Sequence, residues 1–489
     1  MTEATTLCFI GGERISGGGR ETFASVNPAT GDLIGEVAVA SDADLEAAVE
    51  AAKEAQKIWW SWAPSVRAEK LWRWSDLLEQ NGEQIAQLDS KDMGKLLASA
   101  RLEVGAGARN VRYWSAVAAR PLDESIPTIP GHLNYTRREP LGVVGVIIPW
   151  NGPSITFAGR VASALAYGNG VVVKPSEMAS MSAGYMAELT VAAGMPSGLV
   201  NIVHGDGMVG DKMVGHPRIG GVSFTGSVNT GRKVAERAAS SFTKTVLELG
   251  GKGPVIVFDD ADLDTVARAS VWGCYESSGQ VCCAGTRILV SRNRQNELED
   301  LLAAYTSRVR VGDPADASTQ VGPVVSETQL ERVAGFVDRA VAEGARPVVG
   351  GHRIDSRGFF FEPTLFAGLD REASILREEV FGPVLAVVGF DGEDDAVALA
   401  NDTTLGLAAG IWTRDGGRFV RIADRLETGV VWGNTPRLMD PSLPFGGFKD
   451  SGIGNASGSA SADGLTRIKR VSLRVTEDPM TPWDLGTSV

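Results

Sequence analysis

The strongest constraint on the fold of this chain is an alternation of short apolar runs with longer segments of helical spacing, beginning near residue 141. The apolar runs are rich in β-branched residues and carry no charge. Such runs are typical of strands buried on both faces of a parallel sheet. Because helical segments separate them, they predict a doubly wound α/β sheet. The first four runs are Gly142–Ile148, Val171–Val173, Leu199–Val203 and Gly221–Phe224.

The alternation is interrupted at Gly250-Gly251 and then resumes, so we predict two doubly wound parallel-sheet domains. A chain of 489 residues is also too long to form a single hydrophobic core. We expect the first domain to hold residues 1–121 and 141–250, and the second to hold residues 251–450.

Three segments show other patterns. Residues 65–117 are rich in Ala, Leu, Glu and Arg, contain no Pro, and predict helix throughout. Residues 122–140 combine prolines with β-prone residues, which is typical of an extended excursion. The Gly/Ser/Ala-rich residues 451–462 predict a mobile loop.

The composition argues against several classes of protein. A net charge of −13 with no basic stripe does not suit a nucleic-acid partner. The apolar runs are too short to cross a membrane. Four Cys and four His are too few and too scattered for a disulfide framework or a metal site. Because residues 1–14 lack a signal-peptide pattern, we expect a cytoplasmic protein.

Cys282 is the first candidate for chemistry. It lies in the loop Ser277–Arg287, where Gly279 and Gly285 permit a tight bend and close approach to a ligand. A thiol attacks as the thiolate, so a base or an oriented dipole should lie near it. The alternative is a small buried hydrophobe, which is common for free cysteine.

Two polar residues at the ends of strand-like runs could support such a thiol. Glu248 ends the run Lys244–Leu247 and could act as a general base, although an acid at a strand end is often only a surface group. Asn151 follows Gly142–Ile148 and could donate its amide N–H to an oxyanion. The pair Asn151-Gly152 is also ordinary turn material.

Other strand ends could bind a dinucleotide. Residues 205–210 match G-x-G-x-x-G but lack the ribose-binding acid about 20 residues further on, so we do not assign the usual Rossmann fingerprint. Lys174 and Glu177, just past a strand-like run, are better ribose ligands. At Phe224–Ser227, a turn before a helix could bring backbone N–H groups to a phosphate.

In this order and spacing the motifs resemble the aldehyde dehydrogenase superfamily, from about residue 8 to residue 475. The motifs are Pro-Trp-Asn, Lys-Pro-Ser-Glu, Phe-Thr-Gly-Ser, Glu-Leu-Gly-Gly-Lys, Gly-Gln-Val-Cys, Glu-Glu-Val-Phe-Gly-Pro-Val and Pro-Phe-Gly-Gly-Phe-Lys. The resemblance implies that Cys282 is the nucleophile, that Asn151 and the Cys282 N–H form the oxyanion hole, and that Glu248 activates the water that hydrolyses a thioester. A Glu at this position favours hydrolysis over the CoA-acylating reaction.

The resemblance also implies NAD as the cofactor. Lys174 and Glu177 would hold the adenosine ribose, Glu379 would hold the nicotinamide-side ribose, and Phe381 would lie against the nicotinamide. A carboxylate at 177 would repel a 2′-phosphate, so we predict NAD+ over NADP+. The other residues expected at the cofactor are Ile148, Trp150, Ser176, Gly207, Gly210, Phe224, Gly226, Ser227, Leu249 and Gly250.

The predicted substrate tunnel departs from the family pattern. Gly152 and Gly159 stand where aromatic residues are common, which predicts a wide tunnel and a bulky, aromatic or polycyclic aldehyde. Arg437 could instead bind a substrate carboxylate, as in a semialdehyde dehydrogenase, or be a solvated surface residue. The other expected tunnel residues are Val281, Cys283 and Phe445.

The resemblance places oligomerisation segments at residues 122–140 and 465–489, as a small β flap. Strand edges that pair across subunits would remove an exposed edge, so we expect a homodimer or homotetramer. Two rival readings stay open. One is a cofactor-independent thiol esterase that uses Cys282 and Glu248, and the other is a catalytically silent scaffold.

Overall fold

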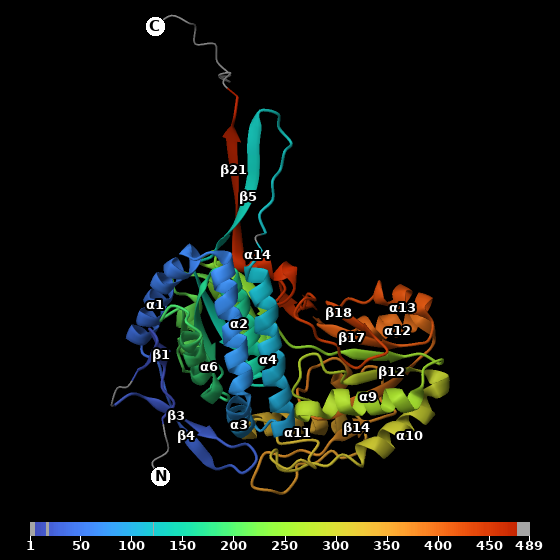
Figure 1. The fold of residues 1–489 in the computed structure, drawn as a ribbon. Helices are drawn as coiled ribbons and strands as arrows, with labels where there is room; N and C mark the ends of the chain where they lie inside the picture. The colour runs from blue at the N-terminus through green and yellow to red at the C-terminus, as the bar shows by residue number, and fades with distance from the viewer. Residues whose placement is uncertain (1–4, 16–18, 121, 477–489) are drawn as a thin grey trace, which may run out of the picture.

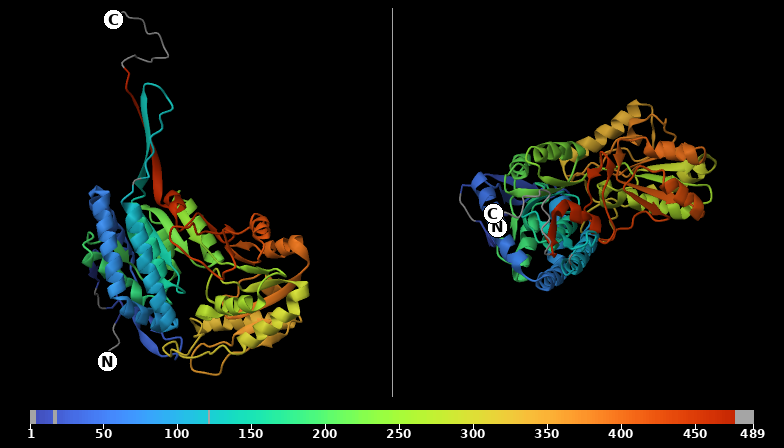
Figure 2. Two further views of the ribbon diagram at one scale, coloured as in Figure 1. Left: turned by 45° about the vertical axis from the view of Figure 1, so that its right-hand side comes forward. Right: turned by 90° about the horizontal axis from the view of Figure 1, so that it is seen from above.

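The computed structural model describes residues 5–15, 19–120 and 122–476. The remaining residues, 1–4, 16–18, 121 and 477–489, lie outside the described ranges, and they include most of the C-terminal part of the predicted 465–489 segment. Two α/β bodies lie side by side, and a two-stranded arm projects from one of them (Figures 1 and 2). The fold class is therefore confirmed as mixed α/β with parallel sheets.

The first body is built on an eight-stranded sheet with the order β2-β1-β8-β7-β6-β9-β10-β20. Its five central strands are parallel, and helices alternate with them along the chain, as the buried apolar runs predict. The strands are β1 (Phe9–Ile10), β2 (Glu13–Arg14), β6 (Val143–Ile148), β7 (Gly170–Pro175), β8 (Val200–Ile202), β9 (Ile219–Thr225), β10 (Lys244–Glu248) and β20 (Gly452–Ile453). The helices are α5 (Pro153–Ala166), α6 (Met181–Ala192), α7 (Gly207–Val214) and α8 (Val228–Ala239).

The second body is built on a seven-stranded sheet with the order β13-β14-β15-β12-β11-β17-β18. Apolar cores cover both of its faces. The strands are β11 (Pro254–Val257), β12 (Arg287–Ser291), β13 (Pro347–Val349), β14 (Thr364–Phe366), β15 (Val384–Phe390), β17 (Ala408–Trp412) and β18 (Val430–Gly433). The helices are α9 (Leu263–Tyr275), α10 (Gln295–Thr306), α11 (Glu327–Ala342), α12 (Gly392–Asn401) and α13 (Gly416–Ala423).

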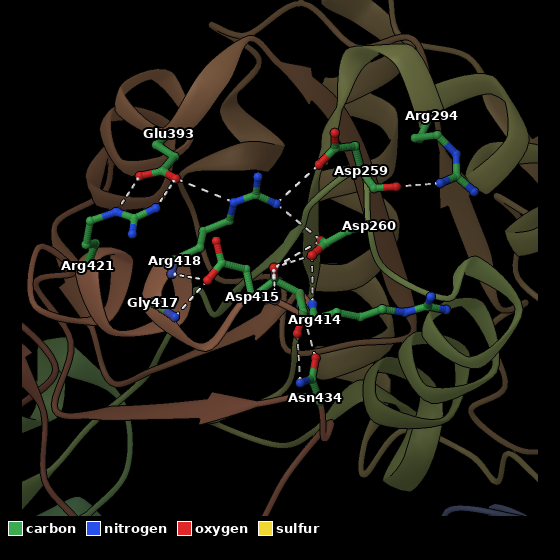
Figure 3. A network of polar contacts seen from close by, with 11 residues as sticks. Asp259, Asp260, Arg294, Glu393, Arg414, Asp415, Gly417, Arg418, Arg421 and Asn434 are labelled. Carbon is green, nitrogen blue, oxygen red and sulfur yellow. Dashed lines mark hydrogen bonds and ion pairs between the residues drawn. The ribbon is translucent and has the colours of Figure 1, made fainter.

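The carboxyl end of the second sheet is closed by its own ion pairs (Figure 3). Arg418 pairs with Asp259 and Asp260, which follow β11, and with Glu393, which follows β15. Ligands of open α/β sheets usually bind at this end of the strands. Here, charged side chains pair with one another beside the ends of β11 and β15.

The N-terminal helices are α1 (Asp42–Ser61), α2 (Pro64–Gln80), α3 (Gly82–Met93) and α4 (Leu97–Ala118). The prediction of helix throughout 65–117 is wrong in its continuity. Asn81 separates α2 from α3, and Gly94 ends α3 in the left-handed conformation at φ +76°. A Cβ on Gly94 would lie 2.6 Å from Pro323, so packing against a distant loop sets this break.

The arm consists of β5 (His132–Pro140) and β21 (Thr466–Arg474), which pair antiparallel along their whole length. It stands clear of both bodies in each side view (Figures 1 and 2). Buried Asn169 anchors its base, because the side chain accepts from Leu141 N at 2.7 Å and donates to Leu465 O at 3.0 Å.

The prediction of a mobile loop at residues 451–462 is wrong. The segment packs between the two bodies, and Ser451 is fully buried. The Ser451 hydroxyl donates to Gly250 O at 2.6 Å and accepts from Gly406 N at 2.9 Å. The segment also contributes β20 to the first sheet and ends at the start of the short helix α14 (Ala462–Leu465). These partners are distant in sequence, so local composition could not reveal them.

The smaller strands are β3 (Thr22–Val26), β4 (Leu33–Ala38), β16 (Leu405–Gly406) and β19 (Phe448–Lys449). Within the described ranges, no helix combines the length and apolarity needed to span a bilayer. In the same ranges, no group of three or more His, Cys, Asp and Glu side chains is placed to hold a metal ion.

Candidate active site

The candidate site lies where the carboxyl end of the first sheet meets the amino end of the second. Asn151 follows β6 and Glu248 ends β10, both in the first sheet. Cys282 precedes β12, and Glu379 precedes β15, both in the second sheet. The ion-paired carboxyl end of the second sheet is thus turned away from the site.

The loop that carries Cys282 is tightly constrained by backbone packing. Ser277, Ser278 and Gly279 all have left-handed backbones, with φ of +53°, +58° and +72°. A Cβ on Gly279 would lie 2.0 Å from Gly382 O, and one on Gly285 would lie 2.4 Å from Val255. These glycines allow close approach to other parts of the protein, whereas the sequence had suggested approach to a ligand. Strain of this kind is typical of a functional loop held by its surroundings.

Cys282, Glu248 and Asn151 converge on one cavity of about 490 Å³. The structure brings together every residue predicted for catalysis and for the substrate. The cavity, which we call the tunnel, is lined by these three residues and by Gly152, Gly159, Val281, Cys283, Arg437 and Phe445.

Asn151 is held at both its side chain and its backbone. Its Nδ2 donates to Gln280 O at 2.8 Å, which ties it to the loop that carries Cys282. Its own carbonyl accepts a hydrogen bond from Lys95 Nζ at 2.7 Å. An amide nitrogen carries two protons, so one N–H remains for a ligand in the tunnel.

Glu248 is only 3 % exposed, and neither carboxylate oxygen accepts a hydrogen bond from the described part of the chain. Burial raises the pKa of Glu248 to about 8, against the opposing charge of Arg160. A carboxyl group with such a pKa is suited to exchange protons near neutral pH.

The two adjacent cysteines differ in their surroundings. The hydrogen bond to Cys283, burial and the charges of Glu379 and Glu248 all raise the pKa of Cys282. The pKa of Cys283 is lowered to about 7 by the hydrogen bond from Cys282 and by the Arg437 guanidinium. The Arg437 guanidinium therefore acts mainly on Cys283, whereas the two nearby carboxyl groups act on Cys282.

A second cavity of about 560 Å³ lies at the carboxyl ends of β6, β7 and β9. Ten of the residues predicted for the cofactor line it, namely Ile148, Trp150, Lys174, Ser176, Glu177, Gly207, Gly210, Phe224, Gly226 and Ser227.

The shape and donors of this cavity fit a dinucleotide. A Cβ on Gly207 would meet no atom within 4 Å, and one on Gly210 would lie 3.5 Å from Lys174, so these glycines leave open space beside the cation. Lys174 Nζ lies 3.5 Å from Glu177, giving a cation and a carboxylate for ribose hydroxyls. Ser227 caps the N-terminus of α8, where helix N–H groups suit a phosphate.

The other four predicted cofactor residues do not line this cavity. Leu249 lines the tunnel. Gly250 packs against Glu379. Glu379 Oε1 accepts a hydrogen bond from Gly251 N at 2.9 Å. Burial raises the pKa of Glu379 to about 7. Phe381 packs edge-on against Trp150 with ring centroids 5.3 Å apart, so this group adjoins the cavity at Trp150.

Sequence reasoning identified Arg437 but missed other charged residues of the tunnel, among them Glu276, Glu103 and Arg160. Arg437 forms an ion pair with Glu276 at 2.5 Å and lies 5.1 Å above the Trp272 ring. Glu103 and Arg160 also line the tunnel. Arg160 is the one charged residue of the otherwise uncharged helix α5, a signal that could have identified it. Glu103 carries no such signal, because only the packing of α4 on α5 brings it here.

Known proteins match this fold and site along nearly the whole chain. Residues 15–471 match the aldehyde dehydrogenase family. A solved aldehyde dehydrogenase from Bacillus cereus, in an NAD+ complex, is 37% identical with a TM-score of 0.95, over 97% of this chain and 98% of that one. A putative aldehyde dehydrogenase from Burkholderia cenocepacia is 36% identical with a TM-score of 0.95, over 98% and 99%. A betaine aldehyde dehydrogenase from Staphylococcus aureus, in complex with NAD+, is 34% identical with a TM-score of 0.95, over 98% and 96%. This chain therefore belongs to the aldehyde dehydrogenase family.

Proposed function

We propose that this protein oxidises a bulky aldehyde to its carboxylic acid with NAD+, through a thioester on Cys282. The observation that carries the proposal is the convergence of Cys282, Asn151 and Glu248 on one tunnel. Such a constellation supplies a nucleophile, an oxyanion donor and a base.

Each of these groups has one chemical task. The Cys282 thiolate adds to the aldehyde carbon and gives a tetrahedral thiohemiacetal. Asn151 Nδ2 and the Cys282 N–H donate to its oxyanion, and removal of one such donor typically costs about 3–4 kcal/mol. NAD+, when bound, accepts the hydride that leaves this carbon. Glu248 then takes a proton from the water that adds to the resulting thioester, and cleavage of the C–S bond releases the carboxylic acid and regenerates the Cys282 thiolate.

Two observations support NAD+ as the cofactor. The relatives from Bacillus cereus and Staphylococcus aureus are in complex with NAD+. The carboxylate of Glu177 lines the cavity that fits a dinucleotide and would repel a 2′-phosphate. A thiol esterase without a cofactor would leave this cavity unexplained, and NADH absorbance that depends on added aldehyde separates the two functions.

Two features of the tunnel support a bulky substrate. Gly152 and Gly159 both line the tunnel. An added Cβ at Gly159 would lie 3.5 Å from Asn110, another lining residue, so an aromatic side chain at position 159 would take up tunnel volume. The tunnel lining also includes the exposed apolar side chains of Leu102 and Met439. Because Glu276 already neutralises Arg437, these contacts favour an uncharged aldehyde over a semialdehyde.

Filling the tunnel tests this proposal. The variants Gly152→Phe and Gly159→Trp should lower kcat/KM for a large aromatic aldehyde by about tenfold or more relative to acetaldehyde, as expected for lost pocket space. An added Cβ at Gly152 would lie 3.2 Å from Ile155 Cγ2, so the first variant requires a small shift of that side chain, whereas the nearest atom at Gly159 is Asn110 Nδ2 at an ordinary 3.5 Å. NADH formation with both aldehydes is the measurement.

A matched control is Gly335→Phe on α11, since no atom lies within 4 Å of its added Cβ and the residue is exposed. This variant should leave the ratio of the two substrates unchanged. A ratio that does not move toward acetaldehyde in the tunnel variants would reject the bulky substrate.

A further inference from the structure

The backbone of Asn151 is held by one buried side chain from another part of the fold. Lys95 Nζ donates to Asn151 O at 2.7 Å, and Lys95 is only 2 % exposed. We propose that Lys95 is a positioning residue that fixes Asn151 for oxyanion binding. This inference rests on the proposed function, because it assigns Lys95 a part in the same reaction.

Lys95 is itself fixed at both ends. Its backbone follows Gly94, whose left-handed turn packs against Pro323, and its carbonyl accepts from Ser90 Oγ at 2.6 Å. Its ammonium group forms an ion pair with Glu103 in addition to the contact with Asn151. The Nζ atom therefore has little freedom to follow Asn151 if that residue moves.

Two acids lie near the Lys95 ammonium group. They are Asp89 and Glu103, and desolvation raises the pKa of each of them. Lys95 pairs directly with Glu103, and its charge also acts on Asp89. Such a cation is costly to bury unless its partners are well placed, so its geometry is well defined.

Asn151 lies in a short segment that belongs to neither a strand nor a helix. The next residue is Gly152, which has no side chain, and α5 begins only at Pro153. The hydrogen bond from Lys95 Nζ holds the carbonyl oxygen of the peptide group that joins Asn151 to Gly152. With the carbonyl held by Lys95 and one Nδ2 proton held by Gln280 O, the side chain of Asn151 is fixed at the wall of the tunnel that Cys282 also lines.

The first measurement is the effect of Lys95→Met on steady-state kinetics, with aldehyde and NAD+ varied in turn. An oxyanion donor that is lost typically lowers kcat by about 10²–10³-fold, so a displaced Asn151 should cost kcat about tenfold to a hundredfold. KM for NAD+ should stay within about twofold, because Lys95 does not line the cofactor cavity. In a Cys283→Ser background, the rate at which iodoacetamide alkylates Cys282 should be the same with and without Lys95→Met, since the nucleophile is unchanged.

A double-mutant cycle with Asn151→Ala separates positioning from general damage. If Lys95 acts through Asn151, Lys95→Met should lower kcat no further once Asn151 is already Ala. If the two losses multiply instead, Lys95 acts independently and the proposal is overturned. Because Lys95→Met leaves Glu103 unpaired and could unfold the chain, the cycle is repeated with Lys95→Met/Glu103→Gln, which removes both charges.

The unmodified protein distinguishes failure of this inference from failure of the proposed function. If it reduces NAD+ in an aldehyde screen and the cycle is multiplicative, only the role of Lys95 is rejected. If it forms no NADH with any aldehyde, both the function and the role of Lys95 are rejected.

Discussion

Burial of Glu248 gives the reaction a predictable dependence on pH. Its pKa is raised to about 8, so most molecules hold a neutral carboxyl at pH 7. Only the carboxylate can take a proton from water, and its fraction grows as the pH rises through about 8. We therefore predict that kcat, where thioester hydrolysis limits it, increases from pH 6.5 to pH 9.

The variant Glu248→Gln provides the control for this pH dependence. It should lower kcat by about 10²–10⁴-fold, the usual contribution of a general base, and should lose the rise with pH. The sign for stability is opposite. A carboxyl group with a raised folded pKa stabilises the protein fully below its ordinary pKa, and this stabilisation is lost as the pH rises through about 8. A rise in kcat that persists in Glu248→Gln would contradict the role of this residue as base.

The sequence predicted the reactive residues better than it predicted the residues that hold them in place. Cys282, Glu248 and Asn151 lie in motifs, and all three meet in the tunnel. Lys95 lies in no motif that points to Asn151, since their contact spans 56 positions of the chain. The partnership of Arg437 with Glu276 spans 161 positions and is set by tertiary packing.

Secondary-structure elements show the same division between local and distant causes. Buried apolar strands and the helices between them follow from local patterns, and the parallel sheets confirm them. The break between α3 and α4 depends on a proline loop more than 200 positions away, and residues 451–462 depend on contacts to both bodies. The local sequence therefore predicts neither the break at Gly94 nor the packing of residues 451–462.

The segment that contains Ser451 should therefore stabilise the fold. We predict that Ser451→Ala lowers the apparent melting temperature by about 4–8 °C, because two buried hydrogen bonds are lost at about 1 kcal/mol each. Differential scanning fluorimetry measures the shift. Ser240→Ala, at the exposed end of α8, should shift it by about 1 °C or less. Equal shifts for the two variants would show that the segment does not stabilise the fold.

For the molecule as a whole, the projecting arm needs a partner. A pair of strands that stands alone is marginally stable in water, and the arm exposes Leu133, Ile468 and Leu473 by 47, 62 and 55 %. We predict that a second copy of this chain covers the arm, so the protein is a homodimer or homotetramer. Ile468→Asp/Leu473→Asp should shift it to a monomer in light scattering.

The control for the arm is Phe242→Asp, since Phe242 is exposed by 96 % in the turn between α8 and β10. This variant should leave the molecular mass unchanged. An arm variant that keeps the mass of the unmodified protein would mean that another surface forms the assembly.

The pairing of β10 with β20 also determines when activity can first appear during synthesis. Glu248 is opposite Gly452 in this pair, and Leu249 N donates to Ser451 O at 2.9 Å. The ribosome makes Glu248 about 200 positions before Gly452. A nascent chain can therefore form most of the first sheet early, but its base is fixed only after residues 451–453 have emerged. Truncation before residue 452 should therefore release chains that are partly folded and inactive.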